Sequence, residues 1–350
     1  MSSPLIPQAV FPISGLGKPV LPVELPRDER LRDHMVEWWY FVGHLKDTSS
    51  SDRFAIEMTA ARLSLSPLRA IETCYIAVID HANKGYLSAD RQSLSAYDHE
   101  QDHLKLVFEP PLGQPDPWRI EGWTAPIRYE LDGGFRVRAT PKAVWEQRAV
   151  RLRFEEADQR PPLLHGKKRI GIVSFFGLEM GYYSRTRLKL EGALKLNARH
   201  LLVDGAGWMD HEWGTGDLLS NRWTFIAVQL DSGEDLCVYR VDKRVAKQGG
   251  PTFGYVVDAT EARYTNKAKI TSDGTVWGPG NYPLRNRIEL DFGLGKRFDL
   301  WVEPEFEDQR RVPTGERALP YVTFWEGAAK VLDQLGNQVG RAFLELAGYQ

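Results

Sequence analysis

The stretch HMVEWWYFVGHL, residues 34–45, carries large apolar side chains at consecutive positions. Successive side chains of a β-strand point to opposite faces of the sheet. As a strand, this stretch presents aromatic rings to both faces, with Glu37, Trp39 and Phe41 on one and Trp38, Tyr40 and Val42 on the other. A strand that is apolar on both faces is buried on both faces. The stretch therefore predicts a wall shared between the interior of a β-barrel and a neighbouring domain.

Glu37 is an acid within this apolar strand, and a buried carboxylate needs a partner. Two interpretations remain open. Glu37 forms an ion pair, for example with an arginine of YYSRTRL (182–188), or it is an acid held in a dry pocket.

Short apolar or alternating segments recur along the chain, separated by Gly, Pro, Asp and Ser. Examples are RFAIEMTAARL (53–63), CYIAVID (74–80), WTFIAVQL (223–230) and GRAFLELAGY (340–349). About twenty such strands with tight turns predict an all-β protein built of antiparallel barrels or sandwiches. A short helix is expected only around residues 64–72.

The strands divide into two halves, each with enough strands for one barrel. WYFVGHLKD (39–47) and WTFIAVQLD (223–231) form a weak internal repeat, and prolines and basic residues interrupt the strands at 160–175. We expect three parts: an irregular Pro-rich strap on the surface over residues 1–30, a β domain over 31–185 and a second β domain over 186–350.

The composition indicates a soluble globular protein. Its 45 basic and 47 acidic side chains give a net charge of −2, with no block of either sign that would suit nucleic acid or a membrane surface. No segment reaches the roughly 18 apolar residues of a membrane span, and the N-terminus lacks the pattern of a signal peptide, so we expect a cytoplasmic location. Cys74 and Cys237 lie in apolar runs and form neither a disulfide framework nor a CxxC metal site.

The segment GWMDHEWGTGDL, residues 207–218, holds the most chemistry in the chain. As a strand it places Met209, His211 and Trp213 on one face and Trp208, Asp210 and Glu212 on the other. His211 beside Trp213 suits a general acid or base next to a ring that stabilises cations. The alternative is structural, with the two acids tied to neighbouring groups and His211 hydrogen-bonded in a core.

Other familiar chemistries lack their residues. Asp210, His211 and Glu212 alternate between faces and cannot reach one ion together, and no HxH or HExxH spacing occurs, so we expect no metal. There is no GxSxG elbow, and GLGKP (15–19) lacks the context of a phosphate-binding loop, so a hydrolase of the α/β type is not supported.

Four segments together resemble the two-domain lipocalin-like family of carotenoid 1,2-hydratases (hydroxyneurosporene synthase type) and AttH-like proteins. They are EWWYFVGHL (37–45), YYSRTRLKLEGAL (182–194), GWMDHEWG (207–214) with RWTFIAVQLDSGEDLCVYRV (222–241), and WEGAAKV with GRAFLELAGY (325–349). The resemblance implies two lipocalin-like barrel domains packed together around an apolar ligand pocket. It does not imply one reaction, because the family includes hydratases of isoprenoids and, among fungal relatives, pericyclases that close polyene chains.

Among these reactions, the one we expect is hydration without a cofactor: Asp210 or His211, at positions that match the family's motif, donates a proton to a C=C bond, and Trp213 and Tyr239 stabilise the resulting cation. The side chains expected to contact the apolar substrate are Glu37, Trp38, Tyr40, His44, Tyr183 and Trp223. The alternatives are a pericyclase or cyclase of a polyene, and a protein that carries an apolar ligand without changing it.

Overall fold

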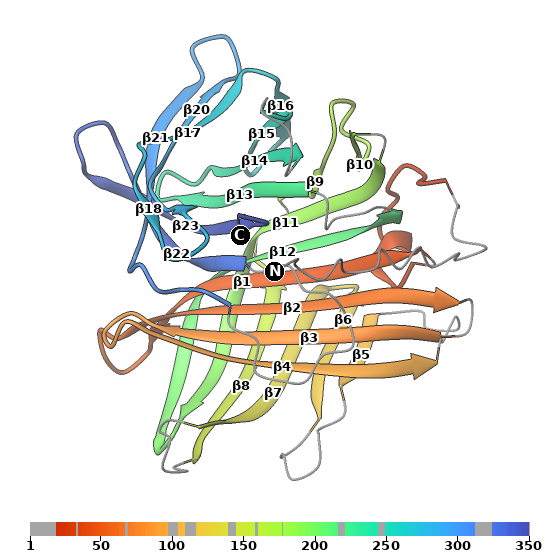
Figure 1. Ribbon diagram of the computed structural model, residues 1–350, viewed down its shortest axis with the longest axis vertical. Helices are drawn as coiled ribbons and strands as arrows, with labels where there is room; N and C mark the ends of the chain where they lie inside the picture. Colours follow the sequence, from red (N-terminus) through yellow and green to blue (C-terminus); the bar gives the residue numbers. More distant parts are fainter. Residues whose placement is uncertain are drawn as a thin grey trace, which may run out of the picture.

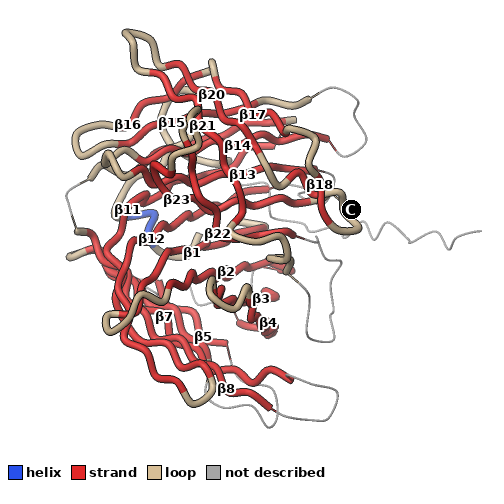
Figure 2. Tube along the Cα trace, turned by 90° about the vertical axis from the view of Figure 1, so that its left-hand side faces the viewer, coloured by secondary structure: helices blue, strands red, loops and turns tan. Residues whose placement is uncertain are grey.

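The computed structural model describes residues 19–32, 34–66, 69–96, 104–108, 117–138, 145–157, 160–176, 178–215, 221–243, 249–311 and 324–349. Nearly all regular structure in these residues is antiparallel strand, gathered into two large sheets that lie one above the other (Figures 1 and 2). The prediction of an all-β protein with two barrel-like sheets is confirmed.

The first sheet has twelve strands and curls until β4 contacts β5 and β7. Two short strands, β9 (Leu163–Leu164) and β10 (Ile172–Phe175), pair with β11 beside the main path. The main path runs in the order β4 (Gly85–Ala96), β3 (Arg69–Asp80), β2 (Arg53–Ser66), β1 (Val36–Asp47), β12 (Arg199–Thr215), β11 (Leu178–Leu196), β8 (Trp145–Glu156), β7 (Ile127–Arg138), β6 (Trp118–Thr124) and β5 (Leu104–Phe108).

The second sheet has nine strands, and β17 at one end of its path contacts β14 and β15 near the other. A separate two-stranded sheet is formed by β18 (Val276–Trp277) and β19 (Tyr282–Pro283). The order of the nine is β16 (Ala262–Thr265), β15 (Thr252–Val257), β14 (Asp235–Lys243), β13 (Asn221–Leu230), β23 (Gln338–Ala347), β22 (Phe324–Leu332), β21 (Arg297–Pro304), β20 (Asn286–Asp291) and β17 (Ala268–Ser272).

Each sheet encloses its own apolar core, and a third apolar cluster lies between the two sheets. The opening strand β1 serves two of these cores at once. Trp39 and Phe41 belong to the core of the first sheet, whereas Tyr40 and Val42 belong to the cluster between the sheets. The prediction that this strand is a wall shared with a neighbouring domain is therefore confirmed.

The described part of the N-terminal segment combines exposed side chains with a few that are buried in the first barrel. The 3-10 helix η1 (Arg27–Glu29) buries Asp28 and Glu29, and the Glu29 carboxylate accepts hydrogen bonds from the hydroxyls of Tyr129 and Tyr183, each at 2.6 Å. The guanidinium of Arg185 donates to the same carboxylate. This segment therefore supplies the anionic partner that the buried phenols and arginine of the barrel require, and the extent of the strap stays a prediction.

Two further expectations differ from the structure. No helix forms at 64–72 in the described residues: β2 and β3 continue as strands, with Ser64 paired to Ala70. The first sheet also continues past residue 185 through β12, and the second begins at Asn221. We therefore propose the boundary between the two domains after Thr215, because β12 pairs along its whole length with β1 or β11.

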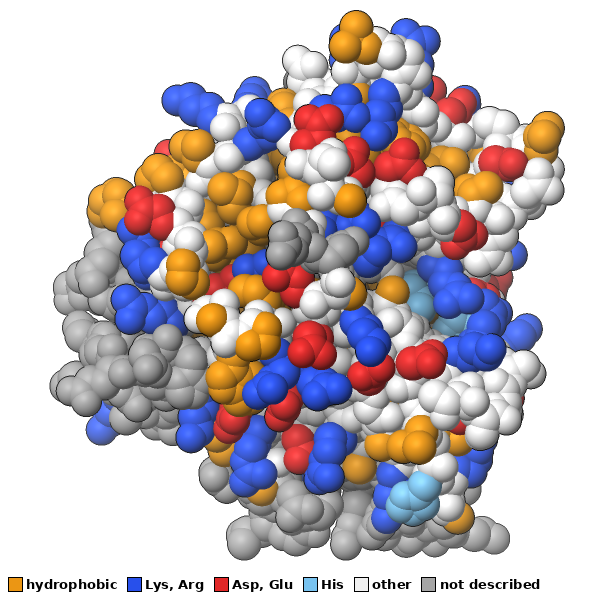
Figure 3. All heavy atoms as spheres, turned by 180° about the vertical axis from the view of Figure 1, so that it is seen from behind, with side chains coloured by type: hydrophobic (Ala, Val, Ile, Leu, Met, Phe, Trp, Pro, Cys, Tyr) orange, Lys and Arg blue, Asp and Glu red, His pale blue; other side chains and the backbone are white. Residues whose placement is uncertain are grey.

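On the face shown in Figure 3, basic and acidic side chains are interspersed. In the described part of the chain, no helix is long and apolar enough to cross a membrane.

Candidate functional site

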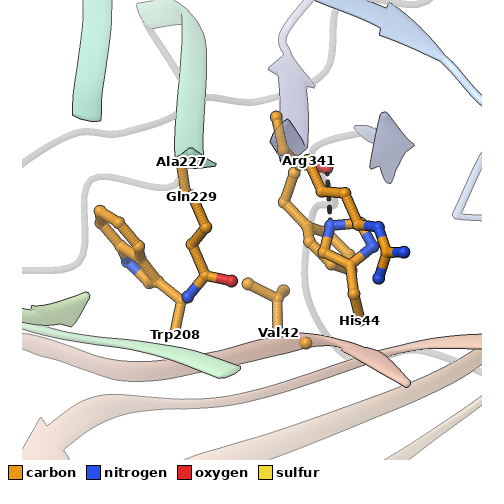
Figure 4. A pocket seen from close by; sticks show the side chains of 9 residues that line it. Val42, His44, Trp208, Ala227, Gln229 and Arg341 are labelled. Atoms are coloured by element: carbon orange, nitrogen blue, oxygen red, sulfur yellow. Dashed lines mark hydrogen bonds between the residues drawn. The ribbon is translucent and has the colours of Figure 1, made fainter. Parts of the chain in front are cut away.

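A small pocket lies between the two sheets, whereas both barrel interiors are filled by buried apolar side chains. It opens between β1 and β12 on one side and β13 and β23 on the other, and its free volume of about 10 Å³ has room for about one water molecule. In Figure 4, Val42, His44 and Trp208 face Ala227, Gln229 and Arg341 across this gap. This volume is far below the 300–1,000 Å³ typical of ligand sites.

The pocket wall is tied across the sheets by hydrogen bonds. His44 Nε2 lies 3.1 Å from the carbonyl oxygen of Ala342, and Gln229 Nε2 donates to the carbonyl oxygen of Gly207 at 3.0 Å. Burial lowers the pKa of His44 to about 3, so this imidazole is neutral at physiological pH. His44, one of the six side chains expected to contact the substrate, lines this pocket.

The strand β12 divides the candidate catalytic residues between two places. Met209, His211 and Trp213 point into the first barrel, and Trp208, Asp210 and Glu212 point toward the second sheet, as the alternation predicted. The ten candidates separate accordingly: Glu37, Tyr183, His211 and Trp213 lie in the barrel, and Trp38, Tyr40, His44, Asp210, Trp223 and Tyr239 lie between the sheets.

His211 is enclosed on every side within the barrel. Its Nε2 lies 2.9 Å from Glu37 Oε1, its ring stacks on Trp39 at 4.4 Å, and Trp213 and Tyr183 pack against it. Burial, followed by the positive charge of Arg32, holds its pKa well below the usual value. A neutral imidazole with no exposed surface fits the structural interpretation of this residue.

The partner of Glu37 is therefore His211 together with the backbone N–H of Arg32, which donates at 2.8 Å. The expected arginine of segment 182–188 is Arg185, and it binds Glu29 instead. Sequence could not distinguish these pairings, because they join residues 156 and 174 positions apart.

Asp210 is the candidate acid that faces the second sheet. It lies opposite Tyr40 on β1 and Ser184 on β11, and its exposed fraction is 1%. Its Oδ1 accepts hydrogen bonds from Ser184 Oγ and, at 2.8 Å, from Trp208 Nε1. Burial raises the pKa of Asp210 to about 7, against the opposing effect of hydrogen bonds from Ser184, Trp208 and Tyr182.

Aromatic rings pack beside Asp210. His165 stacks on Tyr182 with ring centroids 3.5 Å apart, and Tyr239 lies 6.0 Å from Tyr182 and stacks on Phe253 at 4.8 Å. The Tyr255 hydroxyl accepts from the Gly166 N–H at 2.8 Å. Tyr239 thus shares the interface with Asp210, but Trp213 does not.

Four glutamates add to the acidic character of the interface. Indole N–H groups hold two of them: Trp38 donates to Glu212 at 3.2 Å and Trp223 to Glu345 at 2.7 Å. Burial and then the neighbouring acid Asp210 raise the pKa of Glu212 well above its usual value. Burial and then Glu326 raise that of Glu345.

The other two, Glu57 and Glu326, face each other from opposite sheets. The Tyr86 hydroxyl donates to the Glu57 carboxyl at 3.0 Å. Burial raises the pKa of both, with the charge of Glu57 adding to the rise at Glu326. The interface therefore holds several carboxyls that favour their protonated, neutral form.

Sequence reasoning missed His165, Ser184, Glu57, Glu326 and Glu345. Glu345 and Glu326 each stand alone within apolar strands, the same signal that drew attention to Glu37. His165 carries no such signal, because it follows the two-residue strand β9 in a segment interpreted as a seam. In the described ranges, no three His, Cys, Asp or Glu side chains are grouped to hold a metal ion.

Two lipocalin-like antiparallel barrels joined across a shared aromatic and acidic interface define the class of this protein. The chain belongs to the AttH-like family, whose model matches residues 17–349. A search of curated proteins finds no match.

Solved structures share the fold over nearly the whole chain. A putative AttH from Nitrosomonas europaea is 20% identical with a TM-score of 0.71, covering 95% of this chain and 99% of that chain. Kievitone hydratase from Nectria haematococca is 16% identical with a TM-score of 0.61, covering 93% of each chain. CghA is 10% identical with a TM-score of 0.52, covering 90% of this chain and 89% of that chain. At these identities the likeness shows the fold alone.

Proposed function

We propose that the protein is an enzyme that binds an apolar isoprenoid or polyene between its two sheets and adds water to a C=C bond by protonation from Asp210. The observation that carries this proposal is a fully buried carboxyl with a pKa of about 7 in an aromatic interface. An acid with a pKa near the working pH combines a large protonated fraction with a useful driving force for proton transfer.

The chemistry needs three things that this interface can supply. The proton of Asp210 forms a C–H bond as the π bond breaks, and the other alkene carbon becomes a cation. The rings of Tyr182 and Tyr239 stabilise that positive charge. A water oxygen then bonds to the cation and releases a proton, which restores the acid. No cofactor takes part in these steps.

Two of the expected catalytic residues have no place in this proposal. His211 and Trp213 are sealed inside the first barrel, on the opposite face of β12 from Asp210. The relationship to a hydratase of the same fold adds support to the hydration reaction, although that support is by analogy.

The test is turnover of a panel of acyclic isoprenoids and polyenes, followed by mass spectrometry of the extracted products. We expect a product heavier by one water, and a loss of about 10²-fold or more in Asp210→Asn. Asp204→Asn is the matched control, because Asp204 lies exposed on the same strand and its variant should keep full turnover.

Other outcomes would replace the proposal. An isomer of unchanged mass formed equally by wild type and Asp210→Asn would indicate a pericyclase, whose rate depends on cavity shape. Ligand recovered unaltered across the panel would indicate a carrier.

A further inference from the structure

A buried chain of three polar side chains joins Asp210 of β12 to the loop after β9. His165 Nε2 lies 2.7 Å from Ser184 Oγ, and Ser184 Oγ in turn donates to Asp210 Oδ1. None of the three is more than 1% exposed. The arrangement depends on local pairing: Ser184 lies opposite Asp210 across β11 and β12, and His165 lies beside Tyr182 through its backbone N–H at 3.2 Å.

We propose, resting on the function proposed above, that His165 and Ser184 are positioning residues that form a proton relay to Asp210, and that the tautomer of His165 follows the protonation state of Asp210. A serine hydroxyl both donates and accepts, and a neutral imidazole can place its proton on either nitrogen. The chain can therefore be hydrogen-bonded in either direction.

The two directions correspond to the two states of the acid. With Asp210 ionised, His165 Nε2–H donates to Ser184 Oγ and Ser184 O–H donates to Asp210 Oδ1. With the proton on Oδ1, Asp210 donates to Ser184, Ser184 donates to the lone pair of Nε2, and the His165 proton is on Nδ1. The two hydrogen bonds that link His165, Ser184 and Asp210 are made in either state, and the only buried atom of the three residues that changes without a partner among the described residues is His165 Nδ1.

The relay ends at the second ring nitrogen of His165. His165 Nδ1 is buried and has no hydrogen-bond partner among the described residues. During hydration, the proton released by the added water would bind Nδ1, the Nε2 proton would move to Ser184, and the Ser184 proton would move to Asp210 Oδ1. One proton leaves the water and one arrives at the carboxylate, so the acid spent on the alkene is restored.

The surroundings keep His165 neutral while Asp210 titrates. Burial holds the pKa of His165 well below its usual value. The other titratable groups around Asp210 are two phenols, two carboxyls and one thiol, and they come from several strands. They are Tyr40 of β1, Tyr182 of β11, Glu212 of β12, Glu345 of β23 and Cys237 of β14.

The experiment is nuclear magnetic resonance of the substrate-free protein between pH 5 and 9. The ¹⁵N shifts of His165 report its tautomer, and the ¹³Cγ shift of Asp210 reports its protonation. We expect both to change with one midpoint near 7, with His165 passing from Nδ1–H to Nε2–H as the pH rises. Asp210→Asn should abolish the His165 transition.

Ser184→Ala tests the connection between the two. It should leave the His165 tautomer independent of pH and should raise the Asp210 midpoint by about one unit, because a hydrogen bond to the ionised form is lost. Ser64→Ala is the control, since Ser64 is equally buried but donates to the carbonyl oxygen of His34, and it should change neither midpoint.

A His165 tautomer that stays constant while Asp210 titrates would overturn the relay, as would an unchanged transition in Ser184→Ala. Because no substrate is used, these results are independent of the hydration assay. A missing hydration product with an intact relay would instead count against the proposed function alone.

Discussion

Asp210→Asn should stabilise the fold at alkaline pH, even though it removes the proposed acid. Burial raises the pKa of Asp210 from an ordinary 3.8 to about 7. One pKa unit corresponds to about 1.4 kcal/mol, so the ionised carboxylate lowers the free energy of unfolding by about 4 kcal/mol above pH 7. The asparagine keeps an oxygen that can accept from Ser184 and Trp208 but carries no charge.

The sign follows from proton binding. Between about pH 4 and 7 the folded protein holds a proton on Asp210 that the unfolded chain has lost, so the contribution of this group to stability falls as the pH rises through that range. Below pH 4 both states are protonated and the difference disappears. The advantage of Asp210→Asn over wild type should therefore be small at pH 4.5 and reach about 4 kcal/mol at pH 8.

Denaturant unfolding of both proteins at these two pH values measures the effect, with exposed Asp204→Asn as a control that should stay near wild type. The carboxyls of Glu212 and Glu345 are present in both proteins, so most of their own pH dependence cancels. If the unfolding free energy of Asp210→Asn at pH 8 is equal to or lower than that of wild type, ionised Asp210 does not destabilise the fold and the reasoning is refuted.

Two structural predictions concern the first barrel. Glu29→Gln leaves buried Arg185 with only the partly exposed Glu156 as an anionic partner and should lower the unfolding free energy by about 3 kcal/mol, whereas half-exposed Glu130→Gln should change it by less than about 0.5 kcal/mol in the same denaturant titration. In Gly181→Ala the new methyl carbon would lie 2.2 Å from Trp213 Cε2, so we expect a loss of about 1–3 kcal/mol and altered tryptophan fluorescence. Gly249→Ala, with its nearest atom at 3.7 Å, should show neither, and equal behaviour of the two alanine variants would contradict the packing described for Trp213.

Local periodicity was sufficient for much of the architecture. The alternation in β1 and β12 predicted which side chains share a face, and those groupings hold residue by residue from Glu37 to Val42 and from Trp208 to Trp213. It failed at 64–72, where a short apolar run does not distinguish a helix from a strand. It did not show that β12 belongs to the first sheet, because β12 pairs with β1, whose residues precede their partners by more than 150 positions.

The sequence by itself determined that this protein is all-β, that β1 is buried on both faces, and that Asp210 and His211 point in opposite directions. These features depend on the two-residue period of a strand, which any single strand carries. Only the tertiary structure decided which face meets the second sheet, and so which residue is a candidate acid. His211 is enclosed with Glu37 in a filled barrel, whereas Asp210 meets Ser184, His165 and the aromatic wall across the interface. Register and sheet packing bring these groups together from distant parts of the chain, and no local pattern encodes that proximity.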